Sequence, residues 1–432
     1  MNALHTDLYE LTMAAGFFES GKHREQATFE LFVRRFPANR TFLIAAGLAQ
    51  AVEYLLNLSF TGEQIDYLRS LPAFLHASPG FFDYLRELRF TGDLWAMPEG
   101  TVFFPGEPVL CLRAPLIEAQ LPETFLLATV AFQSMIASKA ALVVDAAGGR
   151  SIIEFGSRRA HSPEAAVLAG RAAYIAGCSG TSNVEAGFRF GVPVYGTAAH
   201  SWTMAFASEA AAFRHLQKLL GPETVYLIDT YDTIEGVRRA AALGQPLWGV
   251  RLDSGDLVDL SRAVRRILDE AGLKGAKIMA SGDLNEDKIR DLLAAGAEID
   301  SFGVGTELAT SADAPNLSAV YKMVEIEVGG IKRFTVKFSS EKQTWPGPKQ
   351  VFRFDGVDQI ACSWECPSCP PGSPRSEALL RPVMLKGRLV EPLPALYAVR
   401  AHCERSKGSV QPGHRVGFSA ELQALAARVR PV

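Results

Sequence analysis

The chain has 432 residues, of which 48% are hydrophobic and 21% charged, and its formal net charge is −3. These values are typical of a folded globular protein and exclude a wholly disordered, collagen-like or coiled-coil chain. The length suggests about two or three domains, and the near-neutral charge gives no overall attraction to nucleic acid or anionic lipid. We therefore expect neither nucleic acid nor a membrane as a partner.

The chain is expected to be cytoplasmic. The first ten residues include Asp7 and lack the basic-then-apolar pattern of a secretion signal. The most apolar helical stretch, Phe125–Val144, is interrupted by Gln133 and Lys139. It falls short of the ~20 clean apolar residues that a membrane span needs.

The two ends of the chain share a β-rich pattern. Thr28–Val33 and Leu94–Leu112 are strand-like, and strand patterns resume in Tyr321–Val328, Ile331–Phe338 and Gln350–Phe354. We therefore predict a β-rich α+β domain in which residues 1–120 are completed by the segment 321–432. A separate domain, residues 121–320, is inserted between them.

The inserted domain alternates apolar strands with amphipathic helices. Helical patterns begin at about Pro163 and near Ser201, and another covers Leu257–Ala271. The predicted strands are Ser151–Phe155, Ile175–Cys178, Val192–Tyr195, Val225–Ile228, Leu247–Leu252, Lys277–Ala280 and Ile299–Val304. Such alternation predicts a parallel sheet with right-handed crossovers. The number of units favours an irregular β/α barrel.

Polar residues follow these strands at their carboxyl ends, the rim where β/α barrels carry out chemistry. Helix capping alone would explain Asp229 and Ser281. It does not explain the basic residues on the same rim, which are Arg158, Arg159, His200 and Arg251. The sequence therefore predicts a site at this rim.

The segment Val250–Asp256 places Arg251 beside the carboxylates of Asp253 and Asp256. Such a group can hold an anionic ligand together with sugar hydroxyls or Mg²⁺. The alternative interpretation is an internal ion pair followed by a helix N-cap.

Glycine-rich strand ends suggest phosphate binding. Phe302–Thr306 and Gly180–Asn183 let the backbone approach a ligand and add hydroxyl groups. His200 follows the small residues of Gly196–Ala199 at an expected helix start, where the neutral imidazole is favoured. A lone histidine is more often structural, but the small neighbours of His200 leave space for a reactant.

Taken together, these motifs resemble the nicotinate phosphoribosyltransferase family. They occur in the order Thr6–Tyr9, Glu154–Ala160, Gly180–Asn183, Gly196–Ser201, Val250–Asp256, Phe302–Thr306, Val320–Lys322 and Lys342–Gly347. The likeness covers residues 5 to about 355, whereas the tail from Cys362 matches no family motif. The resemblance implies an irregular α/β barrel with a β-rich domain, working as a homodimer with shared active sites.

The resemblance also implies the reaction. Nicotinate and phosphoribosyl pyrophosphate would give nicotinate mononucleotide and pyrophosphate in the salvage route to NAD. Mg²⁺ would assist, and ATP would be hydrolysed alongside through a transient phosphohistidine.

The family implies a nicotinate pocket. Tyr9 from one subunit and Phe155 from the other would sandwich the pyridine ring, with Arg251 and Thr197 at its carboxylate. Related nicotinamide enzymes carry an aspartate at the position of Ser182, so the serine favours the acid as substrate.

The family also implies a phosphoribosyl pocket. Arg158 would lie near the ring and the phosphates, Asp253 would hold the ribose hydroxyls, and Gly305 and Thr306 would bind the 5′-phosphate. His200 would be phosphorylated by ATP. The expected catalytic residues are thus His200, Arg251 and Asp253.

The tail carries a cysteine cluster. Cys362, Cys366 and Cys369, with the distant Cys403, could form a structural Cys₄ zinc site, although only one Cys-X2-Cys pair has the usual spacing.

Three alternatives stay open. A phosphoribosyltransferase of the same fold could use nicotinamide or quinolinate instead. A barrel lyase or aldolase would need a Schiff-base lysine at a strand end. A non-catalytic zinc-binding interaction module would be centred on Cys362–Cys403.

Overall fold

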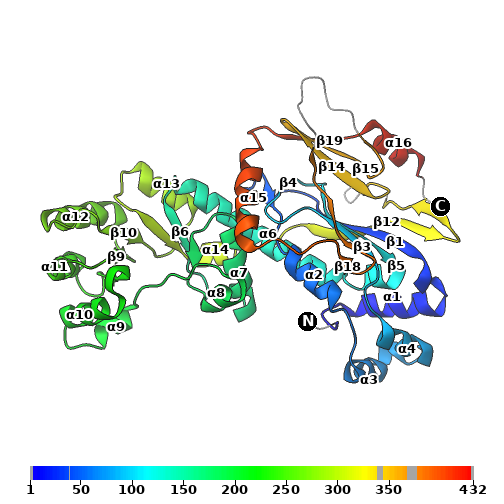
Figure 1. The fold of residues 1–432 in the computed structure, drawn as a ribbon, viewed down its shortest axis with the longest axis horizontal. Coiled ribbons are helices and arrows are strands. Elements are labelled where there is room, and N and C mark those ends of the chain that lie inside the picture. The colour runs from blue at the N-terminus through cyan, green and yellow to red at the C-terminus, as the bar shows by residue number, and fades with distance from the viewer. Residues whose placement is uncertain (1–2, 38, 338–343, 367–376, 430–432) are drawn as a thin grey trace. The chain divides into compact units, whose positions relative to one another are not determined.

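The computed structural model describes residues 3–37, 39–337, 344–366 and 377–429. The chain divides into two units (Figure 1). One unit combines Met1–Met135 with Asn316–Val432, and the other is Ile136–Pro315. The expected boundaries were at residues 120 and 320.

The unit built from both chain ends contains a seven-stranded antiparallel sheet in the order β13-β12-β1-β5-β3-β17-β18. Its strands are β1 (Gln26–Val33), β3 (Asp93–Ala96), β5 (Pro108–Pro115), β12 (Ala319–Val328), β13 (Ile331–Phe334), β17 (Arg381–Leu385) and β18 (Arg388–Leu389). Strand β1 pairs with β12 along its whole length, with Thr28 opposite Glu325. This pairing confirms the predicted β-rich region assembled from both ends of the chain.

A four-stranded sheet, β16-β14-β15-β19, belongs to the same unit. Its strands are β14 (Lys349–Phe354), β15 (Val357–Cys362), β16 (Glu377–Ala378) and β19 (Arg415–Phe418), and a small pair joins β2 (Leu43–Ile44) to β4 (Val102–Phe103). The helices are α1 (Leu8–Glu19), α2 (Leu48–Leu56), α3 (Gly62–Ser70), α4 (Pro79–Glu87), α5 (Leu116–Gln120), α15 (Leu396–Gly408) and α16 (Ala420–Arg428). Thr61 forms a capping box with Gln64 that fixes the start of α3.

Buried charges tie the four-stranded sheet to its surroundings. The Asp358 carboxylate on β15 accepts a hydrogen bond from Arg353 Nε on β14 at 2.9 Å, and His414 Nε2 lies 3.1 Å from it. Arg353 also donates to the carbonyl of Val102 at 2.8 Å. Burial, together with the neighbouring Asp358, raises the pKa of the Glu107 carboxyl well above its usual range.

The long helix α6 (Glu123–Ala146) passes from one unit into the other. By length and hydropathy, Leu116–Ala146 is able to cross a membrane, contrary to the expectation drawn from its two polar interruptions. However, 61% of its most apolar window is buried inside the protein. Lys139 forms buried ion pairs with Glu286 at 2.6 Å and Asp313 at 3.0 Å, so α6 has the properties of a core helix.

The second unit contains a six-stranded parallel sheet in the order β7-β6-β11-β10-β9-β8. Its strands are β6 (Ser151–Glu154), β7 (Gly180–Thr181), β8 (Val225–Leu227), β9 (Gly249–Leu252), β10 (Lys277–Ala280) and β11 (Ser301–Val304). The helices are α7 (Pro163–Ile175), α8 (Val184–Phe190), α9 (His200–Met204), α10 (Glu209–Leu220), α11 (Thr233–Leu243), α12 (Leu257–Glu270), α13 (Glu286–Ala294) and α14 (Thr306–Ala309). The predicted parallel α/β architecture is confirmed.

Arranged as a ring, the strands would follow the order of the chain from β6 to β11, and β11 pairs with β6 again. The two ends of the sheet are β7 and β8, so the ring is open between them. A pairing of these two strands would close it, so closure into a barrel stays a prediction. Two expected strands differ from the structure. Val192–Tyr195 forms only one bridge, between Val194 and Thr181, and Ile175–Cys178 is no strand because Ile175 ends α7.

The helices pack against the sheet through apolar stripes. Val264 and Leu268 of α12 join Val250 and Ile278 of the sheet in one buried cluster.

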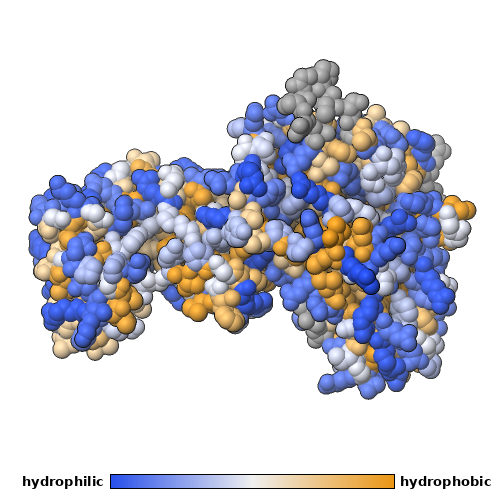
Figure 2. All heavy atoms as spheres, viewed as in Figure 1, coloured by the Kyte–Doolittle hydropathy of each residue, from blue (hydrophilic) through white to orange (hydrophobic). Residues whose placement is uncertain are grey.

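Figure 2 shows apolar side chains gathered near α7 and α8, where Val184 and Phe188 are 73% and 86% exposed. Such an unburied apolar surface is typical of an interaction site.

Candidate active site

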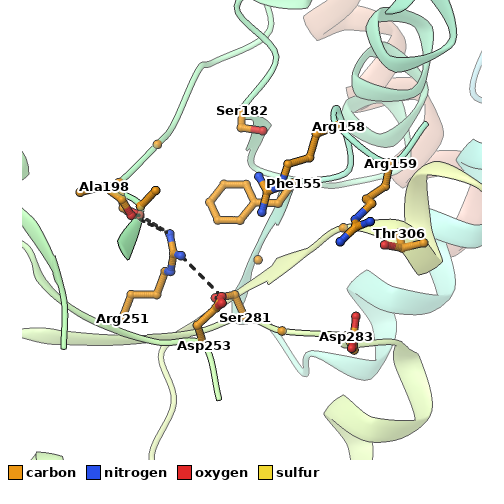
Figure 3. A pocket seen from close by; sticks show the side chains of 16 residues that line it. Phe155, Arg158, Arg159, Ser182, Ala198, Arg251, Asp253, Ser281, Asp283 and Thr306 are labelled. Carbon is orange, nitrogen blue, oxygen red and sulfur yellow. Dashed lines mark hydrogen bonds and ion pairs between the residues drawn. The ribbon is translucent and has the colours of Figure 1, made fainter. Parts of the chain in front are cut away.

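The carboxyl ends of the parallel strands open into a cavity of about 670 Å³ (Figure 3). Side chains from the ends of β6, β7, β9, β10 and β11 and from the segment after Val194 line this cavity. The lining residues include Phe155, Arg158, Arg159, Ser182, Thr197, Arg251, Asp253, Ser281, Asp283, Gly305 and Thr306. The structure thus brings together eight of the predicted site residues: Phe155, Arg158, Ser182, Thr197, Arg251, Asp253, Gly305 and Thr306.

The Arg251 guanidinium lies on one side of the cavity and is only 12% exposed. It donates a hydrogen bond to the Thr197 hydroxyl, and its Nη2 lies 3.5 Å from Asp253 Oδ1. Burial lowers the pKa of Arg251, but arginine remains protonated in proteins. Among the described residues its buried Nε has no hydrogen-bond partner. A cation with an unused donor is suited to bind an anionic ligand.

The Phe155 ring projects into the middle of the cavity, with Arg251 and Asp253 on one side and Arg159 and Thr306 on the other (Figure 3). The backbone N–H of Phe155 donates to the Val304 carbonyl at 2.8 Å. The ring rests on Gly303, where an added Cβ would lie 2.5 Å from Phe155 Cδ2. This arrangement offers an aromatic face to a flat ligand.

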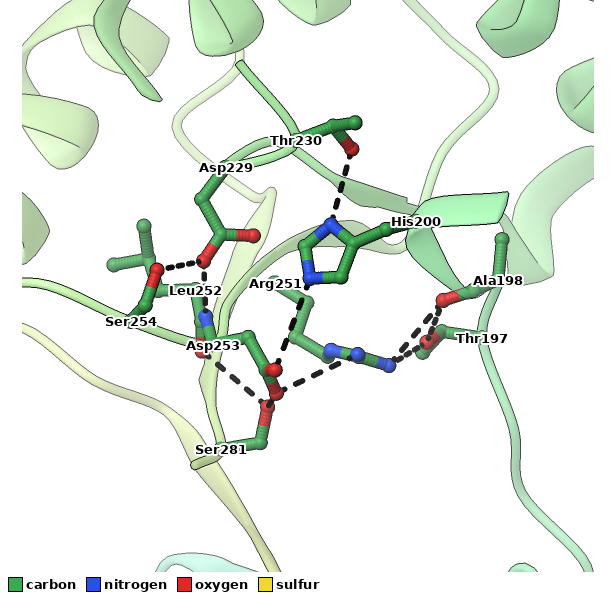
Figure 4. Close-up of polar contacts among 10 residues, drawn as sticks. All are labelled: Thr197, Ala198, His200, Asp229, Thr230, Arg251, Leu252, Asp253, Ser254 and Ser281. Carbon is green, nitrogen blue, oxygen red and sulfur yellow. Dashed lines mark hydrogen bonds and ion pairs between the residues drawn. The ribbon is translucent and has the colours of Figure 1, made fainter. Parts of the chain in front are cut away.

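A polar network fixes the carboxylate of Asp253 (Figure 4). Ser281 donates to Asp253 Oδ1, while the backbone N–H of Asp253 donates to Asp229 Oδ2 at 2.9 Å. Ser254 also donates to Asp229 Oδ2, at 2.8 Å. These bonds hold the loops after β8, β9 and β10 against one another.

His200 approaches the same network from the start of α9. Its Nδ1 lies 3.2 Å from Thr230 Oγ1, and its Nε2 lies 3.9 Å from Asp253 Oδ2. The imidazole is 38% exposed, so a reactant can reach it. His200 and Arg251 are therefore linked through one carboxylate and do not open onto unrelated surfaces.

The buried side chain of Glu154 holds two strand ends of the site together, a role that the sequence did not indicate. Its buried carboxylate accepts hydrogen bonds from the Gly156 N–H and from the Thr181 hydroxyl. Burial raises the pKa of Glu154. This carboxyl group connects the end of β6, which carries Phe155, with the end of β7, which precedes Ser182.

Arg159, one of the basic residues that the sequence placed at this rim, also lines the cavity, and so does Asp283, to which the sequence assigned no role. Asp283 follows Ser281 and Gly282 after β10. This position just beyond a strand end is the signal by which the sequence could have identified Asp283 as a site residue. Gly282 adopts a φ of +94°, and a Cβ there would lie 2.1 Å from the Asp253 carbonyl oxygen. Only glycine lets the two loops approach this closely.

Tyr9 and the described tail cysteines Cys362, Cys366 and Cys403 lie in the other unit. Tyr9 belongs to α1 and is 46% exposed, so it is available for a contact. Cys362 ends β15 and Cys403 lies in α15, while Cys369 is outside the described residues, as are Lys342 and Gln343. Within the described part of the chain, no three His, Cys, Asp or Glu side chains form a metal-binding group. The zinc site stays a prediction.

Comparison with known proteins shows which family the chain resembles. Residues 4–131 match the model of the nicotinate phosphoribosyltransferase (NAPRTase) N-terminal domain, and residues 150–338 match that of the nicotinate phosphoribosyltransferase (NAPRTase) family. The chain is 47% identical to nicotinate phosphoribosyltransferase pncB2 of Mycobacterium tuberculosis (strain ATCC 25618 / H37Rv), covering 90% of this chain and 83% of that protein. It is 32% identical to the nicotinate phosphoribosyltransferase of Homo sapiens, covering 98% and 95%.

Solved structures show the same likeness. The crystal structure of human nicotinic acid phosphoribosyltransferase superposes with a TM-score of 0.85 at 30% identity, covering 98% of this chain and all of that chain. A nicotinate-nucleotide pyrophosphorylase from Pyrococcus furiosus gives a TM-score of 0.77 at 26% identity, covering 94% and 95%.

Proposed function

The chain belongs to the nicotinate phosphoribosyltransferase family, and we propose that it joins nicotinate to phosphoribosyl pyrophosphate in the salvage of NAD. The products are nicotinate mononucleotide and pyrophosphate. The observation that carries this proposal is that one cavity gathers Arg251 and Phe155 together with Asp253, Arg158, Arg159, Gly305 and Thr306.

Arg251 and Phe155 are assigned to nicotinate. The buried guanidinium pairs with the substrate carboxylate, using donors that include the unpartnered Nε. Phe155 lies against the pyridine ring, and Thr197 orients the guanidinium through its hydrogen bond with Arg251. The ring nitrogen is thereby directed toward the sugar.

The remaining polar residues of the cavity, from Asp253 beside Arg251 to Arg159 and Thr306 beyond the Phe155 ring, are assigned to the phosphoribosyl group. Asp253 holds the ribose hydroxyls, Gly305 and Thr306 bind the 5′-phosphate, and Arg158 and Arg159 face the phosphates. The ring nitrogen attacks C1 of the ribose while the bond from C1 to pyrophosphate breaks. Because positive charge develops on the sugar, positioning and electrostatic stabilisation supply most of the catalysis.

The carboxylates near the cavity fit Mg²⁺. Asp229 Oδ1 is buried and has no hydrogen-bond partner among the described residues, and Asp253 and Asp283 line the cavity. Mg²⁺ is usually held by one or two carboxylates together with substrate phosphates. When bound, it would neutralise charge on the departing pyrophosphate. Asp229 also orients Asp253, because Asp229 Oδ2 accepts a hydrogen bond from the backbone N–H of Asp253.

ATP coupling is assigned to His200. Its imidazole is accessible and lies beside Asp253, and Thr230 holds the other ring nitrogen in place. Transfer of the terminal phosphoryl group of ATP to this ring would release ADP, and hydrolysis of the phosphohistidine would then release phosphate. The two steps together would drive the reaction toward nicotinate mononucleotide.

We expect His200→Ala to abolish the stimulation of product formation by ATP while a slow, ATP-independent transfer remains. The substitution removes the phosphate acceptor but leaves Arg251, Phe155 and Asp253 in place. Product formation is measured by mass spectrometry with and without ATP. His215→Ala, at a histidine that stacks on Phe206 in the same unit, is the control and should retain full coupling. Full coupling in His200→Ala would disprove the assignment.

The choice of the acid over the amide is the direct test of the proposed function. We expect kcat/KM for nicotinate to exceed that for nicotinamide by at least about a hundredfold, because only the acid forms a charge-assisted pair with Arg251. Ser182 adds no negative charge that would repel the carboxylate. Faster turnover of nicotinamide would contradict the proposal, and faster turnover of quinolinate would favour the alternative with two carboxylates.

The lyase alternative finds no support in the cavity. None of the side chains that line it, all of which lie in the described part of the chain, is a lysine able to form a Schiff base.

We expect Gly303→Ala to raise KM for nicotinate about tenfold and to change KM for phosphoribosyl pyrophosphate much less. The added methyl group would lie 2.5 Å from Phe155 Cδ2 and displace the ring, at a cost of roughly 1–3 kcal/mol. Gly196→Ala is a matched control, since Gly196 lines the same cavity but an added Cβ there meets nothing within 4 Å. Equal effects of the two substitutions would contradict the role of Phe155.

The proposal includes a cytoplasmic homodimer with shared active sites. Exposed Val184 and Phe188 on α8 and exposed Tyr9 on α1 support a contact between subunits. In such a dimer, Tyr9 of one subunit would complete the nicotinate pocket of the other.

A further inference from the structure

A second cavity, of about 380 Å³, lies in the unit built from both chain ends. One wall is a row of side chains across the seven-stranded sheet, in which Thr28 stands opposite both Arg113 and Glu325. The other wall comes from Lys349 and Gln350 on β14 and from Ser363 and Trp364 after β15. The cavity is therefore formed where residues from both sheets of this unit face each other.

The floor of this cavity is polar where a contact between sheets is usually apolar. Glu325 is only 3% exposed, and its Oε2 accepts no hydrogen bond within the described residues. Lys332 Nζ forms a long ion pair with Oε2 at 3.4 Å, and the Thr28 hydroxyl donates to Oε1 at 3.4 Å. A buried carboxylate is costly unless donors satisfy it, so Glu325 is suited to accept a hydrogen bond from a ligand.

The neighbouring carboxylate of Glu30 has closer hydrogen-bond and ion-pair partners than the carboxylate of Glu325 has. Lys349 Nζ lies 2.7 Å from Glu30 Oε2, and the Lys349 N–H donates to Oε1 at 2.7 Å. Lys349 Nζ also donates to the carbonyls of Trp345 and Gly347. The lysine thus lies closer to Glu30, at 2.7 Å, than Lys332 does to Glu325, at 3.4 Å, which makes Glu325 the more available acceptor for a ligand.

The sides of the cavity are aromatic and its mouth is basic. Trp95 and Trp364 both line it. The Trp364 indole donates to Glu421 Oε1 at 2.8 Å and stacks on Phe334, so it is held in place. Trp364 is half exposed, as is Lys332, and Arg113 is partly exposed, whereas Glu325 is buried. The Glu325 carboxylate therefore lies inward of Trp364, Lys332 and Arg113, of which Arg113 also pairs with Glu327 at 3.2 Å.

We propose that this cavity binds an aminopurine nucleotide. The purine ring would pack against the indoles, its exocyclic amino group would donate to Glu325, and its phosphate would face Lys332 and Arg113. The volume is within the range of small-molecule sites. This site is separate from the catalytic cavity, and the inference does not rest on the proposed function.

The test is calorimetric titration of the full chain with adenosine 5′-monophosphate. Saturating phosphoribosyl pyrophosphate and Mg²⁺ are present to occupy the catalytic cavity. We expect wild type to bind the nucleotide, and Glu325→Gln to bind it at least about tenfold more weakly, the effect of losing a charge-assisted hydrogen bond. Trp364→Leu should weaken binding as well, through loss of stacking at the mouth of the cavity.

Glu404→Gln removes an exposed carboxylate in the same unit, outside the cavity, and should bind the nucleotide like wild type. Phosphoribosyl transfer by each variant reports whether it is folded. Equal affinity of wild type and Glu325→Gln, or no binding by wild type at millimolar nucleotide, would overturn the proposal. If phosphoribosyl pyrophosphate does not bind, the proposed function fails. The comparison of nucleotide binding by wild type and Glu325→Gln would still test the second cavity.

Discussion

Arg251→Met should lower kcat/KM for nicotinate by about a thousandfold, or roughly 4 kcal/mol, the cost of removing one partner of a buried, hydrogen-bonded charge pair. Methionine keeps much of the length of the side chain but cannot donate to the substrate carboxylate. The guanidinium is 12% exposed and has a buried Nε without a partner among the described residues. Little water is therefore available to replace it.

The ratio of activities with nicotinate and nicotinamide separates this effect from a folding defect. Arg251→Met should reduce turnover of nicotinamide much less, because the amide carries no charge to pair with arginine. Asp253 should keep its hydrogen bond from Ser281 in this variant, so the sugar side of the cavity is retained. An equal loss with both substrates would show that Arg251 acts on the fold or on the sugar and not on the acid group.

Asp358→Ala should reduce the free energy of unfolding by about 3–5 kcal/mol, the usual effect of removing one partner of a buried ion pair. Arg353 is 7% exposed and the His414 side chain 1% exposed. Without Asp358, both would lose the carboxylate that joins β14, β15 and the segment before β19. Urea unfolding of the full chain at constant pH measures the change.

Asp355→Ala is the matched control for Asp358→Ala. Asp355 lies in the exposed turn between β14 and β15, where it accepts a long hydrogen bond of 3.3 Å from Gln411. Its removal should change stability by no more than about 0.5 kcal/mol. Similar losses for the two aspartates would contradict a special role for the buried network.

Local patterns in the sequence predicted much of the fold. The strands β6, β9, β10 and β11 follow continuous apolar runs, and α12 follows an apolar stripe of helical spacing. Strand β7 was missed because Gly180–Thr181 is too short to show a period, and the helix α7 extends over part of the strand expected just before it. Short elements of this kind form because their neighbours offer hydrogen bonds, which a local pattern does not reveal.

The sequence by itself determined the chemical groups at the strand ends, the family to which the chain belongs and the pairing of its two ends in one β-rich unit. Only the tertiary structure decided that Arg251 and His200 share the carboxylate of Asp253, that Asp283 and Arg159 line the same cavity, and that Glu154 supports it from behind. Motif spacing reports which residues follow each strand. The order of the strands in the sheet brings distant loops together, and burial decides which of their polar atoms remain available to a ligand.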